Sequence, residues 1–316
     1  LPLDENGKPL RRAMIWLDRR SEPECTRLRA GPLADRLWRV SGNPVASSYI
    51  TGKMLWYLEQ EAPLARKTRL ILQSNSYIVY RLTGAPTQDV SQGNGLHFFD
   101  VAAKAWDAEL IDALGVPRPW LAPICECGAI AGVVTEEAAR ATGLAAGIPV
   151  AAGGLDAACA AFGAGVLRPG EVQEQGGQAG GMSIAVPEAK SHPLLILSPH
   201  VVPGLWLLQG GTVGGGSLNW LRKQFAPGDD RFFEEASRLA GTVPAGSEGL
   251  IFLPYMAGER SPIWDPQAKG AFIGLSYEKT KAHLIRAVME GCAFALRHNL
   301  ETADEAGVSA DVLHSV

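Results

Sequence analysis

The 316-residue sequence has no apolar run long enough to cross a bilayer, and its start, Leu1–Gly7, shows no basic region followed by an apolar core. Neither a membrane span nor a signal peptide is therefore predicted. Basic residues do not predominate either: 29 Lys and Arg stand against 33 Asp and Glu, a net charge of −4, and they are scattered along the chain. This balance argues against a nucleic-acid backbone as the main partner, so no nucleic acid and no membrane are expected.

Cysteine is scarce too, and the five residues show no repeated metal-ligand spacing: Cys25, Cys125, Cys127, Cys159 and Cys292. An odd set without a disulfide framework fits a reducing compartment, so a cytoplasmic location is predicted and no residue is assigned as a metal ligand. Cys159 and Cys292 lie among small residues in helical contexts, which predicts that both pack in the core.

The rest of the chain is organised around the stretch Gly153–Ala161. A short β-compatible run, Ile148–Ala152, precedes its two glycines, and small helix formers follow them. This order predicts a strand, a tight turn and a helix with Asp156 at its first positions. A carboxylate at the end of a strand can take a proton from a bound hydroxyl. The alternative is that Asp156 only caps its helix, the usual role of Asp at that place.

A second candidate site lies near the start of the chain. Asn6-Gly7 predicts a hairpin turn, and Ala13–Trp16 predicts a short strand that runs on to Arg20. On a continuing strand, Trp16, Asp18 and Arg20 share one face. Together an indole, a carboxylate and a guanidinium could clamp a polyhydroxylated ligand, since sugars offer apolar faces and many hydroxyls. An edge strand with a surface Asp–Arg pair explains the same pattern at least as well.

Two glycine-rich segments follow later, Gly176–Gly181 between strand-like runs and Gly210–Gly216 before a helical run. Backbone N–H groups in such segments, above all at a helix N-terminus, suit an anion such as a phosphate. Neither is a P-loop, because Gly-Lys-Ser/Thr is missing, and a hairpin loop has the same composition as the first.

Strands and helices alternate along most of the chain, which predicts an α/β fold. The expected strands are 148–152, 170–175, 182–186, 205–209 and 250–253, and the expected helices include 53–60, 76–82, 230–239 and 280–307. Two units meet near Leu167–Gly170, so we expect domains at residues 1–167 and 168–316. The glycine segments of the second domain are expected to face Asp156 of the first across a ligand-binding cleft.

One late segment, Gly258-Glu259-Arg260-Ser261-Pro262-Ile263-Trp264-Asp265-Pro266, closely resembles the C-terminal signature of the FGGY carbohydrate kinases. Further matches in the same order are Trp16-x-Asp18-x-Arg20, Tyr80–Gly84, Thr135–Pro149, Gly153-x-x-Asp156 and Gly215–Trp220. The resemblance covers almost the whole chain and is closest in style to the xylulokinases.

The resemblance implies a two-domain, actin-like ATPase fold of the ribonuclease-H-like class, with sugar held mainly by the first domain and ATP mainly by the second. Asp156 matches the family's catalytic base, and Trp16, Asp18 and Arg20 match a motif beside the sugar site. The positions that match the neighbourhood of the nucleotide phosphates are Gly177, Gln178, Gly180, Gly215 and Asn219.

The chain also departs from the family pattern. The family normally begins with an Asp-x-Gly-Thr turn that meets phosphates and metal, and it continues past the strand Asp311–Val316 into an adenosine loop. We therefore expect a fold that is incomplete in both domains. Where the family usually has Gly-Thr-Ser-Gly, this chain has Gly177-Gln178-Ala179-Gly180, which removes two hydroxyl donors and keeps the backbone N–H groups.

The function that the resemblance implies is ATP-dependent phosphorylation, with Mg²⁺, of a hydroxyl on a sugar or polyol. A pentulose such as xylulose is the favoured substrate, and a homodimer is left open. A catalytically silent, sugar-binding regulatory protein is the alternative that Gln178-Ala179 favours. An actin-like assembly protein is a third, against which the Trp16, Asp18 and Arg20 set counts.

Overall fold

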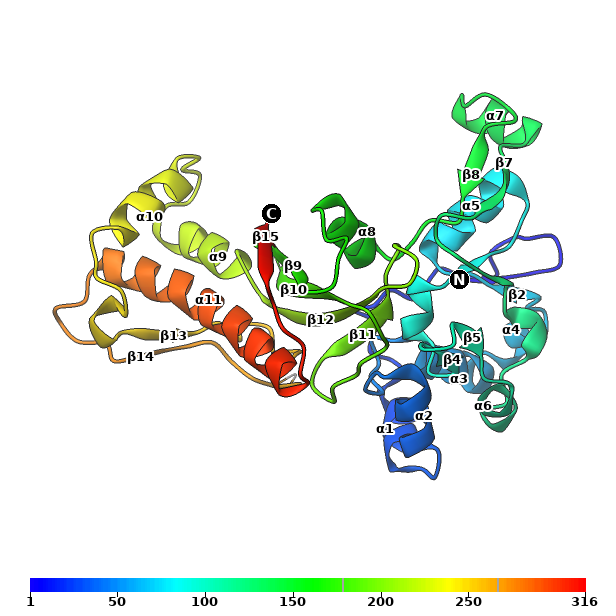
Figure 1. Ribbon diagram of the computed structural model, residues 1–316, viewed down its shortest axis with the longest axis horizontal. Helices are drawn as coiled ribbons and strands as arrows, with labels where there is room; N and C mark the ends of the chain where they lie inside the picture. Colours follow the sequence, from blue (N-terminus) through cyan, green and yellow to red (C-terminus); the bar gives the residue numbers. More distant parts are fainter. Residues whose placement is uncertain (178, 266) are drawn as a thin grey trace. The chain divides into compact units, whose positions relative to one another are not determined.

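The computed structural model describes residues 1–177, 179–265 and 267–316, and Figure 1 shows its helices and strands along the chain. The chain forms two compact units. Unit 1 comprises Leu1–Gly163, Ala185–Pro193 and Leu197–Leu207, and unit 2 comprises Ala164–Ile184, Leu194–Ile196 and Leu208–Val316. The prediction that sugar belongs to residues 1–167 and nucleotide to residues 168–316 concerns ligands, so it stays a prediction.

Unit 1 consists mostly of helices joined by short pairs of strands. Its helices are α1 (Glu22–Ala30), α2 (Ala34–Ser41), α3 (Ile50–Gln60), α4 (Ala62–Ala65), α5 (Ser74–Thr83), α6 (Ala108–Ala113), α7 (Glu136–Thr142) and α8 (Asp156–Gly163). Its strand pairs are β1 (Pro2–Leu3) with β2 (Leu70–Ile71), β3 (Gln88–Asp89) with β6 (Ile124–Cys125), β4 (Phe99–Asp100) with β5 (Ala105–Trp106), and β7 (Ile130–Val133) with β8 (Pro149–Ala151).

Residue chemistry explains where several of these helices begin and end. Helices α5 and α7 are each closed by a glycine in the left-handed conformation, at Gly84 and Gly143. The Thr135 side chain accepts a hydrogen bond from Ala138 N–H and so caps the start of α7. These local signals place the ends of elements before any tertiary contact forms.

The core of unit 1 is rich in aromatic side chains. Tyr57, Phe98, Phe99 and Trp120 are all at most 3% exposed, and the rings of Tyr57 and Trp120 lie 5.8 Å apart. His97 is also fully buried, with its ring nitrogens 3.1 Å from Thr51 Oγ1 and 3.2 Å from the Pro44 carbonyl oxygen. Burial lowers the pKa of His97 to about 4, so the ring is neutral in the folded protein near neutral pH.

Unit 2 carries most of a five-stranded sheet. The strands pair in the order β11 (Ile196–Pro199), β12 (Trp206–Val213), β10 (Ala179–Val186), β9 (Glu171–Gln175) and β15 (Val312–Ser315). Strand β9 runs antiparallel to β10 and parallel to β15. The helices are α9 (Gly216–Phe225), α10 (Phe232–Ala240) and α11 (Lys281–Glu305).

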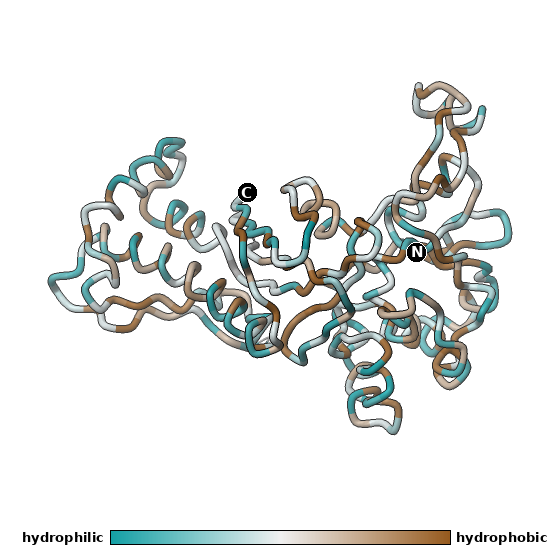
Figure 2. Tube along the Cα trace, viewed as in Figure 1, coloured by the Kyte–Doolittle hydropathy of each residue, from teal (hydrophilic) through white to brown (hydrophobic). Residues whose placement is uncertain are grey.

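A separate strand pair, β13 (Ile251–Leu253) with β14 (Ala271–Ile273), lies against α11. Both strands are apolar, as Figure 2 shows by their brown colour. Phe252 packs with Phe272 and with apolar residues of the helices, including Ile285 and Val288 of α11. The contact is so close that a Cβ on Gly291 of α11 would lie 2.3 Å from the Phe252 carbonyl oxygen.

The predicted α/β class and most predicted elements are confirmed, but three local predictions were wrong. The expected strand Ala13–Trp16 is absent, and Ile15–Asp18 form a turn instead, closed by the Asp18 N–H to Ile15 carbonyl bond. Strand β12 continues through Gly210 and Gly211 to Val213, beyond the strand 205–209 that we expected. Cys159 is exposed, because α8 buries only one face, with Ala158 and Ala161.

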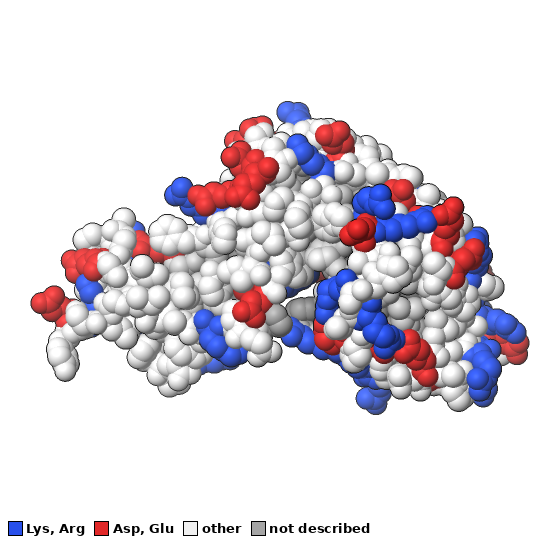
Figure 3. Space-filling view, turned by 90° about the horizontal axis from the view of Figure 1, so that it is seen from below, with Lys and Arg blue, Asp and Glu red and all other residues white. Residues whose placement is uncertain are grey.

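Among the residues described, no helix combines the length and apolarity that a membrane crossing needs. On the face drawn in Figure 3, acidic and basic side chains are interspersed. This agrees with the scattered charges of the sequence.

Candidate active site

Asp156 begins helix α8 directly after a two-glycine turn. Strand β8 ends at Ala151, and Gly153 has a φ of +77°, a left-handed conformation that favours glycine. The Asp156 side chain is exposed, and its Oδ1 accepts a hydrogen bond from Ala157 N–H at 2.8 Å. This bond serves the start of the helix, while the exposed carboxyl remains accessible to a ligand hydroxyl. Its position is compatible with both interpretations, so the catalytic role stays a prediction.

A buried polar cluster, which the sequence analysis missed, lies behind this turn. Ser91 Oγ accepts a hydrogen bond from Leu155 N–H at 2.8 Å and donates one to Asp89 Oδ1 at 2.5 Å. Asn75 Nδ2 donates to Asp89 Oδ2 at 2.8 Å. Asp89 and Ser91 are both 0% exposed. The sequence indicates this cluster only weakly, because the polar segment around Asp89 is equally typical of a loop that simply connects two elements.

Burial raises the pKa of the Asp89 carboxyl above its ordinary value, while the hydrogen bonds from Ser91 and Asn75 act in the opposite direction. Burial also raises the pKa of the neighbouring Cys127 thiol to about 11. The thiol therefore stays protonated near neutral pH, and its sulfur lies 3.8 Å from Asp89 Oδ1. Cys127 acts here as a weak hydrogen-bond donor, and its chemistry is that of a packed thiol.

The structure brings together two of the three predicted sugar-clamp residues. Arg20 Nε donates to both Asp18 oxygens at 2.9 Å, and this hydrogen bonding holds the pKa of the Asp18 carboxyl below its ordinary value. The Arg20 guanidinium stacks 4.8 Å from the centre of the Trp56 ring. Trp16 lies in the adjacent turn and is 62% exposed. The ordered pair and the exposed indole both remain candidates for contact with a ligand.

In unit 2 the two glycine-rich segments meet. Gly215 N–H donates to the Gly177 carbonyl oxygen at 2.8 Å. A Cβ on Gly215 would lie 2.9 Å from the Gly176 oxygen and 3.0 Å from the Gly177 oxygen, so the backbones pack too closely for a side chain there. Gly180 is buried in strand β10, and Gln178 lies outside the described residues.

The segment that carries the family signature anchors this region from the side. Thr212 Oγ1 donates to Glu259 Oε2 at 2.8 Å, and Gly211 N–H donates to Ser261 Oγ at 2.7 Å. Glu259 and Ser261 are 7% and 0% exposed. These contacts fix the last residues of β12, from which the chain enters α9. The sequence alone identifies these two residues as part of the family signature and does not indicate this anchoring role.

The start of α9 offers donors to a phosphate. The first N–H groups of a helix have no partner within the helix, and its dipole favours an anion at that end. Asn219 lies one turn in, where its Oδ1 accepts from Arg222 Nε at 3.2 Å. The N-terminus of this ten-residue helix, next to Gly177, is where the sequence predicts the phosphates of a nucleotide, and that role stays a prediction. Among the described residues no three His, Cys, Asp or Glu side chains are grouped so that they could hold a metal.

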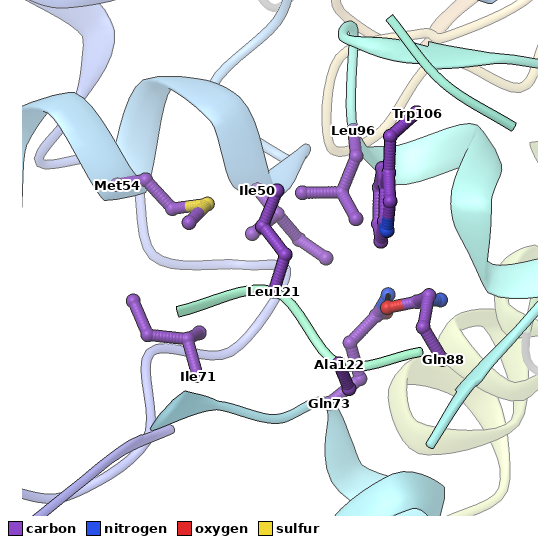
Figure 4. A pocket seen from close by; sticks show the side chains of 9 residues that line it. All are labelled: Ile50, Met54, Ile71, Gln73, Gln88, Leu96, Trp106, Leu121 and Ala122. Atoms are coloured by element: carbon purple, nitrogen blue, oxygen red, sulfur yellow. Dashed lines mark hydrogen bonds between the residues drawn. The ribbon is translucent and has the colours of Figure 1, made fainter. Parts of the chain in front are cut away.

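The described part of unit 1 also contains a small apolar cavity of about 20 Å³, shown in Figure 4. Side chains such as Met54, Leu96 and Trp106 line it, and the amides of Gln73 and Gln88 meet at its edge, 3.1 Å apart. The volume suffices for a water molecule and is far too small for a sugar. This cavity is therefore not a substrate site.

Comparison with known proteins gives matches over nearly the whole chain. The N-terminal domain of the FGGY family of carbohydrate kinases matches residues 1–163, and the C-terminal domain of the same family matches residues 185–316. The chain is 31% identical over 318 residues to a xylulose kinase from Bacillus subtilis, covering 99% of this chain and 63% of that protein. It is 32% identical over 305 residues to a xylulose kinase from Lactococcus lactis, covering 96% and 60%.

Solved structures show the same likeness. The crystal structure of a xylulose kinase from Rhodospirillum rubrum matches with a TM-score of 0.89 and 36% identity, over 97% of this chain and 62% of that one. A gluconate kinase from Lactobacillus acidophilus matches with a TM-score of 0.91 and 25% identity, over 99% and 64%. The chain thus spans less than two thirds of the length of these relatives. The predicted actin-like ATPase fold is confirmed by these matches.

Proposed function

The chain belongs to the FGGY family of carbohydrate kinases, and from this we propose that its protein transfers a phosphoryl group from ATP to a hydroxyl of a sugar or polyol. The observation that carries the proposal is the pair of family matches, which together take in unit 1, most of unit 2 and every candidate site residue except Gly177, Gln178 and Gly180. An exposed carboxylate at the start of α8 supports it, since the reaction requires a group that accepts the hydroxyl proton.

We propose a pentulose such as xylulose as the substrate, because the relatives at 31–32% identity are named xylulose kinases. Gluconate is the main competitor, since a Bacillus licheniformis gluconokinase is 26% identical over 306 residues. A cytoplasmic location and a homodimer are further expectations that accompany the proposal.

Bound ATP, with Mg²⁺, would supply the phosphoryl group. Asp156 would accept the proton of the attacking hydroxyl at one carboxylate oxygen, as a general base. Trp16 would cover an apolar face of the sugar, and the Asp18–Arg20 pair would bond its hydroxyls. The backbone around Gly177, Gln178, Gly180 and Gly215, with Asn219, would hold the phosphates and their negative charge.

The second candidate is a protein of the same fold that binds sugar without phosphorylating it. Gln178-Ala179 favours this function, because the family's usual Thr-Ser supplies two hydroxyl donors that this chain lacks. The two candidates differ in one measurable property, which is turnover of ATP in the presence of a sugar that binds.

The test is a coupled ADP-release assay on the complete gene product with xylulose, ribulose, glycerol and gluconate, paired with calorimetry of sugar and ATP binding. We expect ADP release that depends on sugar and is fastest with a pentulose. Sugar binding without ADP release would favour the silent protein, and fastest turnover of gluconate or glycerol would overturn the pentulose assignment.

A further inference from the structure

The Gly153–Asp156 turn is attached to the rest of unit 1 at both ends through side chains that converge on a single buried carboxylate. On one side, the Leu155 N–H to Ser91 Oγ bond of 2.8 Å ends one residue before Asp156. On the other, Asn75 Nδ2 lies 3.5 Å from the carbonyl oxygen of Ala152, the residue that precedes the glycines. Both Ser91 and Asn75 donate to Asp89.

Asp89 is well suited to hold two side chains in fixed positions. Besides Ser91 and Asn75, its Oδ1 accepts a bond from Gln92 N–H at 3.0 Å. Asn75 is itself oriented, because its Oδ1 accepts from Gln92 Nε2 at 2.8 Å. Charge-assisted hydrogen bonds to a fully buried carboxylate are stronger than neutral ones, and breaking one leaves a buried polar group unsatisfied. The cluster is therefore stiff compared with an exposed loop.

Close packing further restricts the conformation of the turn. A Cβ on Gly154 would lie 2.6 Å from Val201 Cγ1 and 3.1 Å from Ser91 Oγ, so the turn rests directly on the residue that holds it. Gly153 N–H is bonded to the Cys127 carbonyl oxygen at 3.0 Å. Each backbone segment of the turn thus has a partner in the interior of unit 1, whereas the Asp156 side chain points to an exposed position.

We propose that Asp89 and Ser91 are positioning residues for Asp156, holding the turn so that its carboxylate keeps the place required for proton transfer. The inference rests on the proposed function of Asp156 as general base. Asp89 and Ser91 touch neither substrate nor reacting atoms in this proposal, and they act through the backbone of the turn, at Leu155 and, by way of Asn75, at Ala152. A displacement of about 1 Å at a catalytic group can cost about a hundredfold in rate, which is why such a support matters.

The decisive variant is Ser91→Ala, with Ser91→Thr as rescue and Ser41→Ala as matched control. Ser41 is as buried as Ser91 and is also hydrogen-bonded, but its partners are the Leu37 carbonyl oxygen in α2 and the backbone of Asn43, away from the Asp156 turn. In the complete gene product we expect Ser91→Ala to lower kcat about tenfold to a hundredfold with KM for sugar changed less than about threefold. Ser91→Thr restores most of the rate, and Ser41→Ala leaves kcat unchanged.

Amide hydrogen exchange in the peptide that contains Leu155 supplies a readout that does not depend on activity. We expect faster exchange in Ser91→Ala and in Asp89→Asn than in wild type, with no change in Ser41→Ala. Unchanged exchange, or a kcat for Ser91→Ala within about threefold of wild type while Asp156→Asn loses about a hundredfold, would overturn the inference.

The two proposals fail in different ways. If wild type turns over no sugar, or if Asp156→Asn keeps its activity, the proposed function fails, whatever Ser91 does. Exchange at Leu155 then decides alone whether the cluster anchors the turn. If Asp156→Asn is inactive while Ser91→Ala is fully active, the proposed function stands and only the positioning role is lost.

Discussion

The two candidate binding regions are held in place by different means. In unit 1, the turn before Asp156 is fixed by buried side chains, and the network ends in the carboxylate of Asp89. In unit 2, the candidate phosphate region is fixed by backbone packed on backbone, with Gly215 N–H bonded to the Gly177 carbonyl oxygen. Among the described residues, the side chains that bond to this region include Glu259 and Ser261, which bond to β12, and the Cys292 thiol, which donates to the Gly214 carbonyl oxygen at 3.5 Å.

The difference follows from what each region is proposed to do. A general base must offer one side-chain oxygen at a defined point, so the turn that carries it needs support from behind. A phosphate is held by several backbone N–H donors at once, and glycine lets those donors approach closely. The comparison predicts that the turn before Asp156 is disturbed mainly by substitutions that remove buried polar groups. The glycine-rich region of unit 2 should be disturbed mainly by substitutions that add a side chain.

The largest expected effect is that of Asp156→Asn. If Asp156 is the base, kcat in the complete gene product falls by about 10²–10⁴, because the amide cannot accept the proton. Sugar affinity, measured by calorimetry, is expected to stay near wild type, since the side chain is exposed and its loss leaves no buried group unsatisfied. Near-normal turnover would remove the base assignment and with it the contrast between the units.

Acid should weaken unit 1 through His97. The pKa of its fully buried ring is about 4, below the ordinary 6.5, so between these values the unfolded chain binds the proton and the folded chain does not. The free energy of unfolding therefore falls as the pH drops from about 6.5 to about 4, by at most about 3 kcal/mol.

Thermal unfolding of wild type and His97→Gln between pH 7 and pH 4.5 measures this contribution. The variant is expected to be less stable at pH 7 and to lose less stability on acidification. Parallel decline of both proteins over this range would show that other groups govern the acid sensitivity.

Glycine replacements compare the two regions directly. Gly215→Ala brings a methyl group against the carbonyl oxygens of Gly176 and Gly177, and these can move only if the backbone shifts. About 1–3 kcal/mol of stability should therefore be lost, and KM for ATP should rise. Gly154→Ala places its methyl 2.6 Å from one methyl of Val201, so one side chain rather than two backbone carbonyls must shift, and a smaller loss is expected. Gly128→Ala, with no atom within 4 Å, is the control. Equal stability of all three variants would contradict the close packing.

The smallest effect on stability is expected for Arg20→Ala. Its ion pair with Asp18 is partly exposed, with 40% of the Arg20 side chain accessible, and such pairs contribute about 0–1 kcal/mol. If the pair binds sugar, KM for sugar rises severalfold with little change in kcat. Arg118→Ala removes a comparable surface pair with Asp112 and should leave KM unchanged. An equal effect of the two variants on KM would reject the clamp.

Local signals made much of the fold predictable. The strand–turn–helix around Asp156 was expected from three successive composition changes, and it is present as β8, the glycine turn and α8. The ends of α5 and α7 at Gly84 and Gly143 follow the C-cap preference of glycine, a signal that the sequence alone carries. These features depend on residues close together in the chain, where sequence patterns are informative.

The failures involve contacts between distant residues. Gly210 was expected beyond the end of a strand, yet it lies within β12, and a glycine is needed there because a Cβ would be 2.2 Å from Asn299 Oδ1 of α11. The cluster around Asp89 joins residues 75, 89, 91 and 155, which no spacing rule connects. Ala13–Trp16 looked like a strand by composition, but Ile15 and Trp16 are 59% and 62% exposed and have no sheet to join.

Glu259 and Ser261 belong to the very segment by which the chain is recognised, yet their side chains bond to Thr212 and Gly211. Residues that identify a family can thus have a structural role. Here they hold the last residues of β12, from which the chain enters α9. A mutational screen that equates lost activity with ligand contact would count these two residues as ligand contacts, although their described bonds are to the protein itself. Ligand binding and turnover must therefore be measured separately before any residue of this segment is called catalytic.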